Sequence, residues 1–261
     1  MIYFCIPAYN ESATIGLVLW KIRRVLEESA REYQLLVGDD ASDDATPEVL
    51  VPYVKTLPLT VLRSPIRQGY AATVELLLKE ALKRSDRHKR DVAILVPGDF
   101  AADLSALPEF LRRIDSGADV IVGEATLAGE PDRWQRRVRA WAPRLLGRGA
   151  RIDGVRDVVS GFAAFRLISL RNAFRNRTGP WLTTDGWAAN AQLLAWAAAG
   201  ARRVETVPVI ERADRHARPR RHRPFQRARL LWGARHHLTT PPDDVRAERA
   251  PRAAPKEKEA A

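Results

Sequence analysis

Apolar and polar positions follow two different periods along the first 125 residues of the chain. Short, mostly apolar segments, typical of buried strands, occupy residues 2–6, 33–37, 59–62, 92–96 and 119–122. Between these segments, apolar residues recur every three or four positions, which is the spacing of one helix face. Helices are therefore predicted over residues 13–26 (with Ser12 as the N-cap), 46–55, 71–83 and 107–114. This alternation predicts an α/β fold, with a mostly parallel sheet and helices on both of its faces.

The pattern is looser after residue 125. Residues 134–146 form an Arg-rich amphipathic segment. We predict a helix over residues 187–199 that ends at Gly200, a strand over 203–207 stopped by Pro208, and a basic amphipathic helix over 225–237. Residues 240–261 are rich in Pro, Ala and charge, and are predicted to be a disordered tail. The remaining residues, 1–239, are predicted to form one domain with two halves, 1–125 and 126–239.

Composition narrows the class of protein. Hydrophobic residues make up 46% of the 261 residues, which is enough for a core. The longest apolar runs are far shorter than the roughly 20 residues that a membrane span needs. Residues 1–7 lack the basic region and cleavage site of a signal peptide, so a cytoplasmic location is expected. The single Cys5 lies in an apolar run and is predicted to be a buried thiol.

The net charge of +11 is concentrated in two segments. Residues 132–156 carry eight Arg and two Asp, and residues 212–229 carry eight Arg and one Asp. Such segments favour phosphate, whether of a ligand, a lipid headgroup or a nucleic acid. The chain has no helix-turn-helix, RNA-recognition or zinc signature, so a nucleic-acid partner is not expected.

Four polar turns follow predicted strands in the first half of the chain. They are residues 7–11, residues 39–44, residues 67–69 and Asp99. Ligands of parallel α/β sheets bind beyond the carboxyl ends of the strands. We therefore expect Tyr9, Asp40, Gly69 and Asp99 to face one cleft.

Two of these turns resemble the motifs of family 2 glycosyltransferases, which have the Rossmann-like GT-A fold. The first reads Ile-Pro-Ala-Tyr-Asn-Glu from Ile6 to Glu11, and the second reads Val-Gly-Asp-Asp-Ala-Ser-Asp-Asp from Val37 to Asp44. Further on, Asp157–Phe162 and Gly200–Pro208 resemble segments of the dolichyl- and polyprenyl-phosphate sugar synthases of that family. The resemblance covers roughly residues 2–215.

The resemblance implies a donor site for a nucleotide sugar. Its nucleoside would be bound by residues of the first two motifs, namely Pro7, Tyr9, Glu11, Asp39 and Asp40. Arg67 and Gly69 would approach the diphosphate. The family's Asp-x-Asp triplet coordinates Mg²⁺ or Mn²⁺ against that diphosphate, and here it aligns with Pro97-Gly98-Asp99. Asp99 is thus the implied metal ligand and Gly98 part of the donor site.

The sequence departs from the family pattern at two places. Pro97 stands where the first Asp of the triplet is expected, so the metal site has lost one carboxylate. Asp103 is close enough in sequence to contribute, although a helix-entry cap is the simpler role. Ala125 stands where the prenyl-phosphate synthases tend to have an Arg that helps with phosphate, which leaves the acceptor open.

Two acceptors remain, each with its own residues. A polyprenyl (dolichyl-type) phosphate would be bound by Ser160, by Arg136 or Arg137, and by Arg215, with the protein resting peripherally on the inner face of an anionic membrane. A hydroxyl acceptor needs a general base, and Asp185 is the candidate, with capping of the 187–199 helix as the alternative role. Inversion at the anomeric carbon is expected with either. The alternative from another functional class is that the protein is an inactive relative of the family, or a basic protein that binds nucleic acid or membranes.

Overall fold

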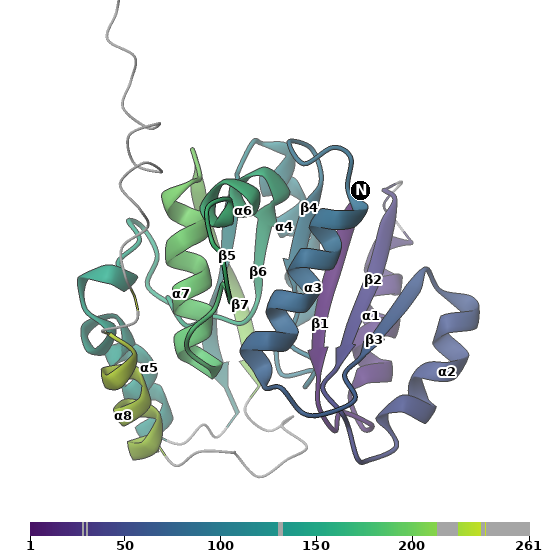
Figure 1. The fold of residues 1–261 in the computed structure, drawn as a ribbon, viewed down its shortest axis with the longest axis horizontal. Coiled ribbons are helices and arrows are strands. Elements are labelled where there is room, and N and C mark those ends of the chain that lie inside the picture. The colour runs from purple at the N-terminus through teal and green to yellow at the C-terminus, as the bar shows by residue number, and fades with distance from the viewer. Residues whose placement is uncertain (28, 30, 130–132, 213–223, 236–237, 239–261) are drawn as a thin grey trace, which may run out of the picture.

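The computed structural model describes residues 1–27, 29, 31–129, 133–212, 224–235 and 238. Their centre is a seven-stranded sheet with the order β3-β2-β1-β4-β6-β5-β7 (Figure 1). The strands are β1 (Ile2–Ala8), β2 (Tyr33–Asp39), β3 (Leu59–Arg63), β4 (Val92–Leu95), β5 (Val120–Ala128), β6 (Ala163–Arg166) and β7 (Val204–Arg212). Only β6 runs antiparallel to its neighbours, so the carboxyl ends of the other six strands meet at one edge.

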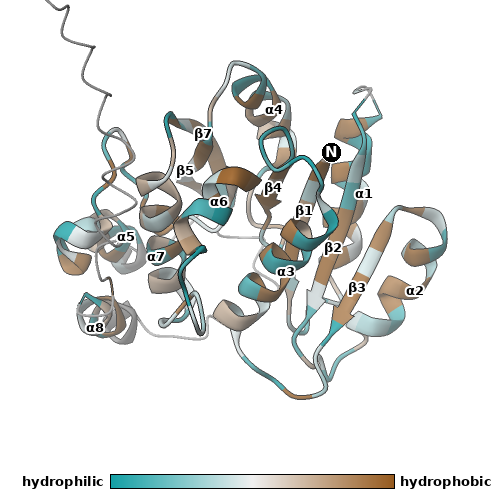
Figure 2. Cartoon of the chain, turned by 45° about the horizontal axis from the view of Figure 1, so that its top comes forward, coloured by the Kyte–Doolittle hydropathy of each residue, from teal (hydrophilic) through white to brown (hydrophobic). Residues whose placement is uncertain are grey.

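Helices cover both faces of the sheet, as the alternating pattern predicts. One face packs against α1 (Ile15–Leu26), α2 (Thr46–Thr56) and α4 (Leu107–Asp115), and the other against α3 (Tyr70–Arg84), α6 (Leu167–Phe174) and α7 (Gly186–Ala199). Figure 2 shows apolar residues along β2 and β3 and polar residues on the outer side of α3. Five residues of α1 at helical spacing are buried, and each contributes on the order of 1.5–3 kcal/mol through its buried area.

Two further helices extend the fold beyond β7. They are α5 (Arg133–Leu146) and α8 (Pro224–Ala234), which pack against each other and against α7 (Figure 1). Ala142 and Leu146 of α5 meet Leu231 and Ala234 of α8 in a separate small core. No helix in the described part of the chain is long and apolar enough to cross a membrane.

The structure corrects two details of the prediction. Helix α1 begins at Ile15 with Thr14 in the N-cap position, so Ser12 is not the cap. The N–H of Ser12 instead donates to Asp44 at 3.1 Å, because this loop is fastened to the turn after β2. Strand β7 passes through Pro208 and ends at Arg212. Proline is tolerated there because β7 is the edge strand of the sheet.

Other elements were missed or fall outside the described residues. The short strand β6 and helix α6 were not predicted, and β5 is longer than its apolar core, reaching Ala128. Asp103 does cap a helix entry, since it accepts the N–H of Ser105 at 3.0 Å. Cys5 is buried, as expected. The predicted tail, residues 240–261, lies outside the described residues.

Candidate functional site

One large cavity opens at the carboxyl ends of the parallel strands, with a volume of about 1120 Å³. Its wall combines the loops after β1, β2 and β4 with the segments before β6 and α7 and with parts of α5 and α8. Eight residues of the predicted donor and acceptor sites line this cavity, namely Pro7, Tyr9, Glu11, Asp40, Gly98, Asp99, Ser160 and Asp185. Arg67 and Gly69, which were expected at the same cleft, are not among its lining residues. The topology therefore brings together side chains that lie up to about 180 residues apart along the chain, as expected from the strand ends.

Asp40 fastens the loop that leads into α3. Its two carboxylate oxygens accept the N–H groups of Gln68 and Gly69, at 2.7 and 2.9 Å. Asp40 is 3% exposed, and Gly69 has a φ of +99°, which favours glycine. The N–H of Gly69 is thus directed at Asp40, and approach of a diphosphate to this backbone remains a prediction.

Asp185 contributes a second carboxylate to the same helix terminus. It occupies the N-cap position of α7, but its side chain makes no capping bond there. Its Oδ1 instead accepts the N–H of Ala71, in the first turn of α3, at 3.0 Å. Asp185 lines the cavity, so the interaction with α3 orients this carboxylate within the site.

Close packing positions the loop after β1. Tyr9 has the guanidinium of Arg67 over its ring, 3.9 Å from the centroid. Glu11 accepts the hydroxyl of Thr14 at 2.9 Å. A Cβ at Gly98 would lie 2.8 Å from the carbonyl oxygen of Pro7, so only glycine fits at that position. The loops after β1 and β4 are therefore in contact, and Asp99 follows directly.

Asp39 differs from the other predicted donor residues. It is fully buried at the end of β2 and is not part of the cavity wall. Its Oδ1 accepts the N–H of Ser42 at 3.0 Å, and Arg63 Nε lies 3.4 Å from Oδ2. The structure thus gives Asp39 a part in shaping the turn after β2, and its contact with a nucleoside remains a prediction.

The predicted acceptor residues are placed in three different ways. The Ser160 hydroxyl bonds the backbone of Phe162, which forms the tight turn before β6. Arg136 and Arg137 are exposed on α5 and do not line the cavity. Arg215 lies outside the described residues.

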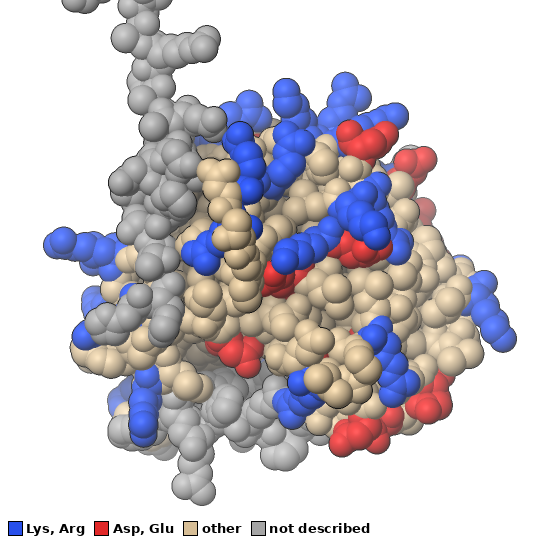
Figure 3. Space-filling view, in the orientation of Figure 1, with Lys and Arg blue, Asp and Glu red and all other residues tan. Residues whose placement is uncertain are grey.

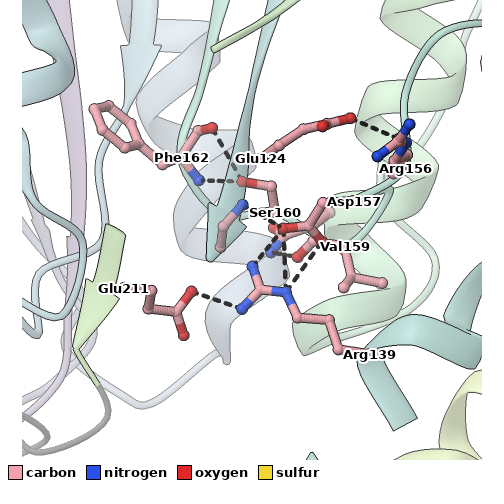
Figure 4. Close-up of polar contacts among 10 residues, drawn as sticks. Glu124, Arg139, Arg156, Asp157, Val159, Ser160, Phe162 and Glu211 are labelled. Atoms are coloured by element: carbon pink, nitrogen blue, oxygen red, sulfur yellow. Dashed lines mark hydrogen bonds and ion pairs between the residues drawn. The ribbon is translucent and has the colours of Figure 1, made fainter. Parts of the chain in front are cut away.

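Sequence reasoning missed an ion cluster in the cavity wall, formed by Arg139, Asp157 and Glu211 (Figure 4). Arg139 is spaced three and seven residues from the buried Ala142 and Leu146, so it lies on the inner face of α5. Glu211 continues the inward alternation of β7. An Arg on an apolar helix face was the signal in the sequence for this cluster.

A hydrogen-bond chain supports the turn around Ser160 from the other side. The hydroxyl of Tyr70 donates to Asn190 Oδ1 at 2.8 Å, and Asn190 Nδ2 donates to the carbonyl of Val159 at 3.1 Å. Burial raises the pKa of Tyr70, so its hydroxyl keeps its proton at neutral pH. Tyr70 lines the cavity and holds its wall in place.

The cavity wall is acidic where it is described. Five carboxylates line it, namely Glu11, Asp40, Asp99, Asp185 and Glu211, against two guanidinium groups, Arg139 and Arg229. Figure 3 shows basic side chains along the upper edge of the molecule and also on its left side and lower part. A cation would offset the repulsion between these described carboxylates and an anionic diphosphate.

The described residues of this site could hold a divalent cation only together with oxygen atoms of a bound substrate or water. Among the described residues, no three His, Cys, Asp or Glu side chains gather in a way that could hold a metal ion. Asp99 lines the cavity, and its Oδ1 accepts the N–H of Ala101 at 3.1 Å. Mg²⁺ is often held by one or two carboxylates together with substrate phosphates and water, which is what this wall can offer.

Comparison with known proteins identifies the family. Residues 3–174 match the family model described as glycosyl transferase family 2. The chain belongs to this family. A dolichol-phosphate mannosyltransferase of Pyrococcus furiosus is 27% identical over 166 residues, covering 62% of this chain and 45% of that protein. An undecaprenyl-phosphate mannosyltransferase of Micrococcus luteus is 27% identical over 170 residues, covering 64% of this chain and 66% of the relative.

This family 2 chain thus spans from about half to two thirds of the length of those relatives. Solved structures agree on the fold. Glucosyl-3-phosphoglycerate synthase from Mycobacterium tuberculosis, in complex with Mn²⁺ and uridine-diphosphate-glucose, has a TM-score of 0.62 at 17% identity, covering 91% of this chain and 78% of that one. The predicted GT-A fold is therefore confirmed.

Proposed function

We propose that this protein is an inverting hexosyltransferase that moves a sugar from a nucleotide-sugar donor to a polyprenyl phosphate. The observation that supports it most is the meeting of Tyr9, Asp40 and Asp99 in one cavity. The names of the relatives add the acceptor, since both mannosyltransferases act with a polyprenol-type phosphate. Family membership supports the sugar transfer itself.

The reaction needs one bond to form and one to break at the anomeric carbon. An oxygen of the acceptor phosphate attacks this carbon from the side opposite the donor diphosphate, and the nucleoside diphosphate departs with the bonding electrons. A phosphate monoester has a second pKa of about 6, so its attacking oxygen is ionised near neutral pH without a strong base. The task of this chain is to bind and align the two substrates.

Asp99 is the residue that would hold Mg²⁺ or Mn²⁺, together with oxygens of the donor diphosphate. A bound divalent cation neutralises the diphosphate and stabilises it as a leaving group. The described part of the cavity wall supports a role for such a cation, because its five carboxylates outnumber its two guanidinium groups. Gly98, which precedes Asp99, lets the backbone after β4 lie close to the carbonyl oxygen of Pro7.

A panel of nucleotide sugars tests the proposal directly. Each donor would be incubated with Mg²⁺ or Mn²⁺ and either a polyprenyl phosphate or a hydroxyl acceptor, and product would be scored by mass spectrometry. Transfer to the polyprenyl phosphate is the expected result. Transfer to hydroxyl acceptors alone, or to none, would contradict the proposed acceptor.

A hydroxyl acceptor is the second candidate, because Asp185 lines the cavity with an orienting bond to Ala71. The change Asp185→Asn separates the two acceptors. The amide oxygen of Asn can still accept the N–H of Ala71, so the fold should be retained. With a phosphate acceptor we expect turnover within about tenfold of the wild type, whereas loss of a general base costs about 10²–10⁴-fold. Steady-state kinetics with saturating donor measures the difference.

We also propose that α5 and α8 rest on an anionic membrane, which would make this a peripheral protein of the inner membrane face. Neither helix contains an acidic residue. Exposed large apolar side chains occur on both, namely Trp134, Trp141, Leu230 and Trp232. Arg137 lies over the ring of Trp134 and Arg235 over that of Trp232, so aromatic and basic groups alternate on this surface. Such a surface suits a layer of anionic headgroups.

Vesicle binding tests this surface. The wild type should sediment with vesicles of phosphatidylglycerol at low salt and be released at high salt, since each Arg near such a surface contributes about 1 kcal/mol. The double change Trp134→Ala and Trp232→Ala should weaken binding about tenfold or more, because partial burial of each ring contributes on the order of 1 kcal/mol. Trp20→Ala, which removes a similarly exposed ring from α1, is the matched control. Equal binding to anionic and neutral vesicles would contradict the proposal.

A further inference from the structure

The side chain of Arg139 joins α5 to two other parts of the cavity wall (Figure 4). Its Nε and Nη2 donate to the carboxylate of Asp157, with the shortest contact at 2.7 Å, and its Nη1 donates to Glu211 Oε2 at 2.6 Å. The three side chains are only 10%, 8% and 18% exposed. Two carboxylates therefore compensate one guanidinium at a poorly solvated position, and the cluster is net negative.

The partners of Arg139 connect it to the segments that shape the site. Asp157 Oδ2 also accepts the N–H of Ala125, and Asp157 begins the turn that contains Ser160. The backbone of Glu211 forms an antiparallel β-bridge with Ala102, in the segment just after Asp99. One arginine thus links α5, the turn around Ser160 and the segment that follows the implied metal ligand.

An arginine in the wall of such a cavity can bind an anionic substrate or hold the wall together. Burial alone would lower the pKa of Arg139, but the neighbouring charges of Asp157 and Glu211 raise it, so the guanidinium stays charged. At least three of its five N–H groups are committed to these carboxylates. A phosphate that approached Arg139 would be repelled by the net negative charge of the cluster, and it would have to displace a carboxylate.

We propose that Arg139 is a positioning residue, which fixes the acceptor side of the cavity through Asp157 and Glu211 and does not itself bind the acceptor phosphate. This inference rests on the proposed transfer to a polyprenyl phosphate and assigns a residue to its acceptor side. Strand β5 shares this support, because the backbone N–H of Ala125 is bound to the carboxylate that Arg139 holds.

Two isosteric or charge-retaining changes test the proposal kinetically. Arg139→Lys keeps the charge but loses the two-pronged contact with Asp157. We expect kcat/KM for the polyprenyl phosphate to fall about 10- to 100-fold, as for small misplacements of substrate, with the donor KM within about twofold of the wild type. Glu211→Gln keeps an acceptor for Nη1, and we expect it to leave the acceptor KM within about threefold, since the amide oxygen can still accept a hydrogen bond from the charged guanidinium.

Direct binding of phosphate by Arg139 predicts the opposite result. Removal of a competing charge in Glu211→Gln would then lower the acceptor KM several-fold. That outcome, or wild-type activity in Arg139→Lys, would overturn the proposal. Arg112→Lys is the matched control, because Arg112 pairs with Glu109 on the surface of α4 and is 74% exposed. It should behave as the wild type.

Hydrogen exchange measured by mass spectrometry makes the test independent of activity. Arg139→Lys should accelerate exchange in residues 99–103 and 157–162 relative to Arg112→Lys, while β1 and β2 remain unchanged. Unchanged exchange in both segments would overturn the positioning role. If the wild type transfers no sugar to polyprenyl phosphate, the proposed function fails, and the exchange result still decides whether Arg139 holds the cavity wall.

Discussion

Sugar transfer by Asp99→Asn should fall about 10³-fold at a metal concentration that saturates the wild type. The side-chain oxygen of Asn can still accept the N–H of Ala101, so the turn should keep its shape. The amide is, however, a much poorer ligand for a hard cation than a carboxylate. Stabilisation of a departing diphosphate by a metal is worth several kcal/mol, and each 1.4 kcal/mol is a factor of ten in rate. Initial rates measured across a Mn²⁺ titration provide the test.

Asp103→Asn is the control for this experiment. Asp103 is four residues away, accepts the N–H of Ser105 and is not part of the cavity wall. Its rate should stay within about twofold of the wild type, because Asn is also a good cap residue. Activity that persists in Asp99→Ala after chelation of all divalent metal would contradict the metal's role, whichever acceptor is used.

Much of the fold could be predicted because its periodicity is strong. Strands β1 to β4 are short and mostly apolar, and helices α1 and α3 keep an apolar face over three or more turns, so the two kinds of element are easily told apart. Strand β6 has only four residues, Ala163–Arg166, and passes directly into α6. Its antiparallel pairing with β4 and β5 arises from the tertiary fold, which a four-residue run cannot indicate.

In the candidate site, too, residues placed by the local sequence could be predicted, and contacts between distant parts of the chain could not. Tyr9, Asp40 and Asp99 could be predicted because each follows a strand, and the ends of parallel strands meet at one edge. The hydrogen-bond partners of Asp185 and Arg139 could not be predicted. Asp185 bonds a backbone group 114 residues away, and Arg139 pairs with Glu211 across 72 residues. Nothing in the local sequence specifies such pairs, since they depend on how α3, α5 and β7 are packed.

Binding of a nucleoside diphosphate should be weakened about 10- to 100-fold by Asp40→Asn. The carboxylate of Asp40 accepts two backbone N–H groups, those of Gln68 and Gly69, at a nearly buried position. An amide offers one acceptor oxygen and places an NH₂ group against the second N–H. Each hydrogen bond to a charged group is worth about 1.5–3 kcal/mol, so the loop into α3 should shift and disturb the donor site. Titration calorimetry with uridine diphosphate and Mn²⁺ measures the loss without any acceptor.

The matched control for this change lies three residues away in the same turn. Asp43 is exposed, and Asp43→Asn makes the same chemical substitution with no cost in buried hydrogen bonds, so its affinity should stay within about twofold of the wild type. Circular dichroism of both variants separates a local shift from unfolding. Wild-type affinity in a folded Asp40→Asn protein would mean that the turn after β2 does not shape the donor site. Asp40 would then serve only to start α3, where a carboxylate near the helix N-terminus is also favourable.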